Sequence, residues 1–154
     1  MLIGLISDTH GLLRQSALSA LEGVDRIVHA GDIDRPEILA RLNEIAPVFA
    51  VRGNIDRHAG LADLPTFDIL DSGGGTLIGV VHDIGTLDTD PLAAGLAAVV
   101  FGHSHRPKVE MVNGVLFINP GSAGPRRFKL PVAMGLMEIR EGAVSARILT
   151  LNDD

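Results

Sequence analysis

Residues 2–51 read LIGLISDTHGLLRQSALSALEGVDRIVHAGDIDRPEILARLNEIAPVFAV, and this stretch decides the fold. Three short apolar runs lie at residues 2–7, 26–30 and 48–51, and each is typical of a buried strand. Between them, residues 12–21 and 36–45 carry apolar side chains at helical spacing. The alternation of strands and helices predicts a parallel sheet with right-handed crossovers.

The remainder of the chain predicts hairpins. Strand-like residues 66–70 and 76–82 flank a glycine-rich turn, residues 109–112 and 115–118 flank Asn113-Gly114, and residues 132–139 and 143–151 flank Glu141-Gly142. A buried strand is expected at 97–101, after a short helix from Asp90 to Leu96. We therefore expect residues 1–154 to form a single α/β domain with a parallel first half and an antiparallel second half.

The composition argues against several classes of protein. Thirteen basic and nineteen acidic side chains give a formal charge of −6, which disfavours stable binding to nucleic acid or to a membrane surface. Cys is absent, so disulfides, zinc–thiolate sites and a cysteine nucleophile are excluded. Residues 1–7 do not resemble a signal peptide, and no apolar run reaches the ~20 residues of a membrane span. A cytoplasmic protein is the resulting expectation.

Polar side chains of metal-ligand type follow most of the predicted strands. They are Asp8, His10, Asp32, Asn54, His82, His103 and His105. Because the carboxyl ends of strands line one crevice in an open α/β sheet, we expect these side chains to converge. The set is too large for one tetrahedral ion and predicts two ions that share a bridging carboxylate. The Asp-x-His and His-x-His spacings predict that each pair lies on one face of its strand.

Each of these clusters also has a plainer interpretation. Asp-x-His alone is common in surface loops, and Gly-Asp and Gly-Asn are ordinary turn dipeptides. His29 lies within a predicted strand and is expected to be a hydrogen-bonded core residue, while His58 is expected to be solvated. The basic cluster Arg126, Arg127 and Lys129 is interpreted as a solvated loop rather than a phosphate clamp.

The joint pattern resembles the calcineurin-like metallophosphoesterase superfamily. The motifs that carry the resemblance are Asp8-x-His10, Gly31-Asp32, Gly53-Asn54, His82 and Gly102-His-x-His105, in this order. The small size resembles the YfcE-type phosphodiesterase branch, and Asn119-Pro-Gly-Ser122 followed by Pro125-Arg126 is similar to a further segment of that branch. The resemblance implies an α+β sandwich, in which two packed mixed β-sheets are flanked by helices.

The resemblance also implies a role for each motif residue. Asp8, His10 and His105 would hold one divalent ion, Asn54, His82 and His103 the other, and Asp32 would bridge them. Mn²⁺ is the first expectation, with Fe, Zn, Ni or Mg as alternatives. The implied reaction is hydrolysis of a small phosphodiester by in-line attack of a metal-bridging hydroxide, with Asn54 contacting the phosphate.

Two departures from the family pattern leave alternatives open. Ile55 stands where many members have a His that protonates the leaving group, and Asp83 follows His82 where Gly is common. The missing acid favours a diester with a good leaving group over a phosphomonoester of a nucleotide or phosphoprotein. A non-catalytic scaffold with this fold is a further alternative, although all seven ligand positions are intact. The edges of the sheets could pair to form a homo-oligomer.

Overall fold

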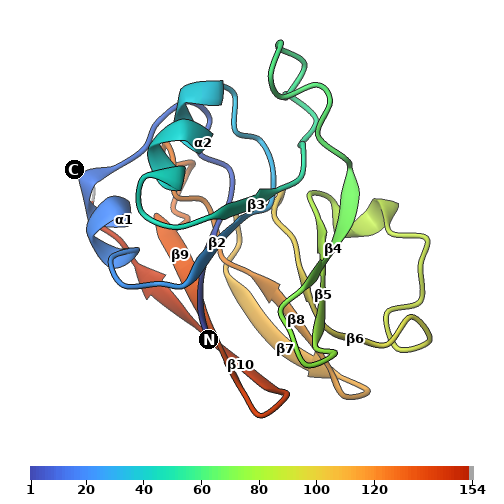
Figure 1. Ribbon diagram of the computed structural model, residues 1–154. Helices are drawn as coiled ribbons and strands as arrows, with labels where there is room; N and C mark the ends of the chain where they lie inside the picture. The colour runs from blue at the N-terminus through green and yellow to red at the C-terminus, as the bar shows by residue number, and fades with distance from the viewer. Residues whose placement is uncertain (153–154) are drawn as a thin grey trace.

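The computed structural model describes residues 1–152 and contains two five-stranded β-sheets packed face to face (Figure 1). The first sheet has the order β10-β9-β1-β2-β3, with β1 at Leu2–Ile6, β2 at Arg26–His29, β3 at Val48–Ala50, β9 at Ala133–Arg140 and β10 at Ala143–Thr150. The second has the order β4-β5-β6-β8-β7, with β4 at Phe67–Asp71, β5 at Leu77–Val81, β6 at Leu96–Val100, β7 at Lys108–Val112 and β8 at Val115–Asn119. The sandwich of two mixed sheets is thus confirmed.

Strand pairing agrees with the prediction in the first half of the chain and differs in the second. Strands β1, β2 and β3 are parallel, and the hairpin β9–β10 joins this sheet through an antiparallel pair with β1. In the second sheet β5, β6 and β8 are parallel, and only the edge strands β4 and β7 are antiparallel. The three predicted hairpins are confirmed as the antiparallel pairs β4–β5, β7–β8 and β9–β10. The prediction of an antiparallel second half is wrong for β5, β6 and β8, because the chain crosses over between β5 and β6 and because β8, rather than β7, pairs with β6.

The two α-helices, α1 at Gln15–Ala20 and α2 at Pro36–Asn43, cover the outer face of the first sheet (Figure 1). The side chains of Ala17 and Leu42 pack there with Ile27 of β2. The outer face of the second sheet is covered by the segment between β5 and β6, which includes the 3₁₀ turn η1 at Ile84–Thr86. The flanking helices therefore lie on one side of the sandwich.

The predicted helix from Asp90 to Leu96 is a turn instead. The Asp90 carboxylate accepts a hydrogen bond from the Leu92 N–H at 3.1 Å, as in a helix cap. Gly95 then adopts φ +74°, which ends the turn, and the chain enters β6 at Leu96. No helix in the described residues is long and apolar enough to cross a membrane.

A buried apolar layer joins the two sheets. Ile3, Leu5 and Val28 of the first sheet pack with Val100 and Ile118 of the second. Because β1, β2, β5 and β6 run through this layer in register with their parallel neighbours, their carboxyl ends emerge at one edge of the sandwich. The polar clusters follow these ends, so the packing of the core positions the site.

Candidate metal centre

The structure brings five of the seven predicted ligands into one cluster. Asp8 and His10 follow β1, Asp32 follows β2, His82 follows β5, and His105 lies in the loop after β6. Two groups of these residues have potential ligand atoms within 4.8 Å of one another: Asp8, His10 and His105, and Asp8, Asp32 and His82. The expectation that strand ends converge is borne out for these five side chains.

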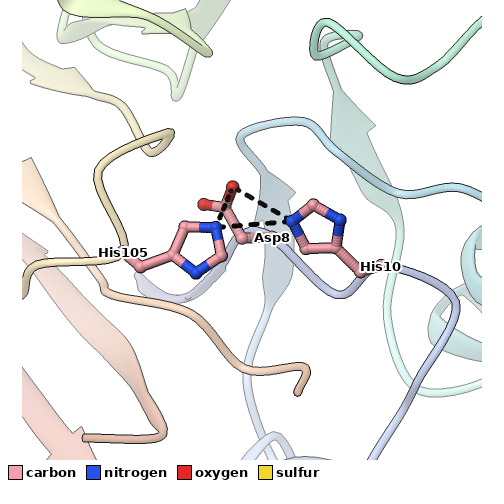
Figure 2. Close-up of side chains that lie close together, drawn as sticks. All are labelled: Asp8, His10 and His105. Carbon is pink, nitrogen blue, oxygen red and sulfur yellow. Dashed lines mark hydrogen bonds and ion pairs between the residues drawn. The ribbon is translucent and has the colours of Figure 1, made fainter. Parts of the chain in front are cut away.

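Asp8 belongs to both groups and joins them. Figure 2 shows its carboxylate between the imidazoles of His10 and His105, whose Nε2 atoms are 3.4 Å apart. Asp8 Oδ1 lies 3.2 Å from His105 Nε2, 3.8 Å from His10 Nε2 and 3.8 Å from His82 Nε2. Asp32 Oδ2 lies 3.3 Å from His82 Nε2 and 3.7 Å from His10 Nε2. Both carboxylates are therefore within reach of both histidine groups.

The backbone conformation of these residues differs from the predicted strand pleat. Five of the predicted ligands have positive φ: Asp8 (54°), His10 (46°), Asp32 (54°), His103 (71°) and His105 (61°). They lie beyond the strand ends, where left-handed turns rather than period-two alternation aim their side chains. The left-handed region is sparsely populated by non-glycine residues, and Asp and His are among those enriched there. Such strain is typical of functional sites, where surrounding structure enforces it.

Two glycines allow the loops to approach the carboxylates closely. A Cβ atom on Gly53 would overlap the backbone nitrogen and Oδ1 of Asp32. A Cβ atom on Gly102 would overlap Ser7 Oγ and would lie 2.6 Å from Asp8 Oδ2. Only residues without a side chain therefore fit at these two positions beside the carboxylates.

The Asp8 carboxylate is charged and has one oxygen free to bind a cation. Its Oδ2 accepts hydrogen bonds from Ser7 Oγ at 2.7 Å and from the His103 N–H at 3.2 Å. Burial acts to raise the pKa of Asp8, but the imidazoles of His10 and His105 outweigh it and hold this pKa well below its usual range. Asp8 Oδ1 is buried and accepts no hydrogen bond from residues 1–152. A buried carboxylate oxygen that faces imidazole nitrogens but accepts no hydrogen bond fits coordination of a metal ion.

His82 is oriented so that one nitrogen faces the carboxylates. Its Nδ1–H donates to the carbonyl oxygen of Ala30 at 2.8 Å, which leaves Nε2 as the ligand atom in the neutral ring. This Nε2 is buried without a hydrogen bond to any described residue. Burial acts to lower the pKa of His82, but Asp32 and Asp8 outweigh it and raise this pKa. Burial acts to raise the pKa of Asp32, but the imidazole of His82 outweighs it and lowers this pKa. The carboxylates of Asp32 and Asp8 thus favour a positive charge beside the Nε2 atom of His82.

Asp56 is a positioning residue that the sequence analysis missed. It is buried, and its Oδ1 accepts the N–H groups of Ile33 at 2.9 Å and Asp34 at 2.8 Å. Its Oδ2 accepts the N–H of Gly53 at 2.7 Å. One carboxylate therefore ties the loop that carries Asp32 to the loop that carries Asn54. The acidic residue two positions after Asn54 was the signal in the sequence that could have identified this role.

The segment Asn119–Ser122 supports the opposite side of the cluster. Asn119 Nδ2 donates to the carbonyl oxygen of Gly102 at 3.0 Å and to Ser104 Oγ at 3.1 Å. Ser122 Oγ donates to the carbonyl oxygen of Asp8 at 2.9 Å. These bonds hold the 102–105 loop and the Asp8 turn from behind, so the segment acts on the site without supplying a ligand.

Comparison with known proteins identifies the family. The model of the calcineurin-like phosphoesterase superfamily domain matches residues 1–142. The chain belongs to this superfamily. A probable metallophosphoesterase of Methanothermobacter thermautotrophicus is 35% identical over 148 residues, which cover 88% of this chain and 85% of that protein. A crystal structure of a predicted phosphoesterase from Streptococcus pneumoniae is 28% identical, with a TM-score of 0.74 and coverage of 97% of this chain and 88% of that one.

More distant structures share the fold of this phosphoesterase. An archaeal phosphodiesterase has a TM-score of 0.77 at 22% identity, with coverage of 97% of this chain and 100% of that one. Vps29 from Chaetomium thermophilum has a TM-score of 0.77 at 19% identity, with coverage of 98% and 96%. The family and its relatives confirm the prediction of a metal-dependent phosphoesterase. The superfamily uses divalent metals, and the Asp/His cluster described above is a possible site for them.

The two remaining predicted ligands of the phosphoesterase lie at the rim of the cluster. Asn54 is exposed, and the His103 side chain is 49% exposed. The ring of His103 stands edge-on to that of His82, with 5.2 Å between centroids. Both rim residues line a pocket of about 340 Å³ together with His82. Asp83 lies on the same pocket, with its Oδ2 4.0 Å from His103 Nε2.

The histidines that were not predicted to be ligands lie outside the cluster. His29 is fully buried; its Nδ1 accepts the Gly31 N–H at 3.1 Å, and its Nε2 lies 3.0 Å from Thr9 Oγ1. Burial lowers the pKa of His29 to about 3, so the ring is neutral. The His58 side chain is 65% exposed, and its Nε2 lies 3.7 Å from Asp34 Oδ1. The predictions of a core role for His29 and a solvated one for His58 are confirmed.

Proposed function

We propose that this phosphoesterase is a binuclear-metal phosphodiesterase acting on small phosphodiesters. The observation that carries the proposal is the position of the two carboxylates: Asp8 Oδ1 lies 3.2–3.8 Å from the Nε2 atoms of His10, His82 and His105, and Asp32 Oδ2 lies 3.3–3.7 Å from those of His10 and His82. Two carboxylates set among three imidazoles suit a pair of ions better than a single one.

In this proposal Asp8, His10 and His105 hold one ion, Asn54, His82 and His103 hold the other, and Asp32 bridges them. The donors are nitrogen and oxygen only, which suits Mn²⁺ first and also Fe, Zn, Ni or Mg. Divalent ions bound there would make hydroxide available at neutral pH and would neutralise charge on the phosphoryl oxygens. Asn54 is exposed at the rim, where its amide N–H can donate to a phosphate oxygen.

The preference for a diester rests on the residue that follows Asn54. Ile55 cannot donate a proton, so the site favours a leaving group that departs without protonation by a side chain at this position. The comparison that tests this preference is hydrolysis of bis(p-nitrophenyl) phosphate against p-nitrophenyl phosphate on one sample of protein. A faster rate with the monoester would contradict it.

The metal stoichiometry tests the binuclear site. Calorimetry should give two equivalents of Mn²⁺ for the wild-type chain and fewer for Asp32→Asn, because one carboxylate would serve both ions. Asp34→Asn is the matched control, since Asp34 lies two residues away and faces His58 rather than the cluster. Two equivalents in Asp32→Asn would refute the bridge. Hydrolysis of bis(p-nitrophenyl) phosphate that survives chelation, or that no divalent metal supports, would refute the activity.

A further inference from the structure

The pocket beside His82 and His103 is lined by two arginines that form no ion pair with a carboxylate among residues 1–152. Arg52 and Arg57 both line it, and among residues 1–152 neither forms an ion pair. The chain as a whole is acidic, with a formal charge of −6. The lining of the pocket has two arginines against two aspartates, Asp56 and Asp83, so it does not share the net negative charge of the chain.

Arg52 is held in place and retains donor capacity. Its backbone N–H donates to the carbonyl oxygen of Pro65 at 2.9 Å, and its Nη1 donates to that of Ala62 at 3.2 Å. Its Nε–H is buried without a hydrogen-bond partner among the described residues. A guanidinium has five N–H donors, so these contacts leave part of the group available to a ligand.

The carboxylates on the same pocket are already engaged. Asp56 uses both oxygens on the backbone N–H groups of Ile33, Asp34 and Gly53. Asp83 Oδ1 accepts the Gly85 N–H at 2.9 Å, and its Oδ2 faces His103. Neither carboxylate therefore forms an ion pair with Arg52 or Arg57, and both arginines keep their charge for another anion.

We propose that this pocket binds a second phosphate group, carried on one ester arm of the substrate. Guanidinium groups match phosphate in charge and in the geometry of their donors. Asn54, His82 and His103 line the same pocket, so an arm that enters it would begin at the metal centre. A volume of about 340 Å³ is sufficient for one such arm. The assignment of the substrate as a diester rests on the proposed function, whereas the anion site stands on the pocket itself.

Calorimetry with two nucleotides that differ by one phosphate tests the pocket. Thymidine 3′,5′-bisphosphate and thymidine 5′-monophosphate are titrated into the Mn²⁺-loaded protein, and the ratio of their affinities is the readout. We expect the bisphosphate to bind about tenfold more tightly, the effect of one charge-assisted contact. Arg57→Gln should reduce this ratio to about two. Arg140→Gln, which removes a guanidinium on β9 outside the pocket, should leave the wild-type ratio.

Salt and kinetics separate the pocket from the proposed activity. The preference for the bisphosphate should shrink as salt rises to about 0.5 M, because screening weakens an exposed charge contact. The p-nitrophenyl diester of thymidine 5′-phosphate is then assayed with and without a 3′-phosphate. We expect kcat/KM to be about tenfold higher with the 3′-phosphate, as for the affinities. If neither diester is hydrolysed, the proposed function fails while calorimetry still decides the pocket. Equal affinities in the wild-type protein, or an unchanged ratio in Arg57→Gln, overturn the inference.

Discussion

Replacement of Asp56 by Ala should destabilise the fold and loosen the metal centre together. The change leaves three backbone N–H groups, those of Ile33, Asp34 and Gly53, without their acceptor. The bond to Ile33 is buried and the other two are partly buried, so water can replace part of what is lost. Hydrogen bonds to charged groups contribute about 1.5–3 kcal/mol each, and we expect a loss of about 4 kcal/mol in the free energy of unfolding.

Asp56→Asn refines the estimate. The amide keeps an oxygen for two of the N–H groups and loses mainly the bond to Gly53, so the loss should be about 1–2 kcal/mol. Asp63→Ala is the matched control, since Asp63 is an exposed carboxylate in the same loop region and should change the free energy by less than about 0.5 kcal/mol.

Urea unfolding in the presence of a chelator measures these differences without a contribution from metal. The chain has no Trp or Tyr, so far-UV circular dichroism is the suitable probe. A second titration, with Mn²⁺ under native conditions, should show weaker binding in Asp56→Ala because the loops that carry Asp32 and Asn54 are no longer tied together. An unfolding free energy within about 1 kcal/mol of the wild type would refute the reasoning.

Three further predictions concern single positions. Gly102→Ala should weaken Mn²⁺ binding at least about tenfold in calorimetry, because its Cβ would displace Asp8; Gly74→Ala, with open space around its Cβ, should not. Glu141→Asn should raise stability in urea by about 0.5–1 kcal/mol, because Glu141 has φ 50° and Asn tolerates this conformation better; a decrease would contradict it. His29 has a folded pKa of about 3 against 6.5 for the free ring, so its contribution to stability is full above pH 6.5 and is lost as pH falls toward 3. His29→Gln should therefore unfold with a pH slope smaller by about 1.4 kcal/mol per unit between these values, and equal slopes would contradict the assignment.

The strands were predictable because each is a short apolar run ended by polar or turn residues. Asn113-Gly114 adopts φ values of 50° and 81°, as expected of a two-residue hairpin turn. The parallel pairing of β6 with β8 was not predictable, since either strand of that hairpin could have paired with β6 and packing of Ile118 into the core decides between them. The Asp90–Leu96 segment shows the same limit, because its capping pattern also suits a single turn.

The chemistry of the site was predictable from residue types, whereas its geometry was not. Asp8 and His10 were correctly expected at one strand end, but alternation along a strand was the wrong reason. Their left-handed backbone depends on contacts far away in the sequence, such as the bond from Ser122 Oγ to the Asp8 carbonyl oxygen. Asp56 was missed for a related reason: its three N–H partners come from two loops that only the folded chain brings together.

The cluster draws its side chains from both layers of the sandwich, and this has a mechanical consequence. Asp8, His10 and Asp32 belong to loops of the first sheet, while His82 and His105 belong to loops of the second. Ions bound as proposed would cross-link the two sheets at this edge. The hairpin turns at Asn113 and Glu141 would have no such cross-link. Loss of metal would then allow the two sheets to separate locally at this edge. Amide hydrogen exchange should therefore become faster first in the loops after β1 and β6.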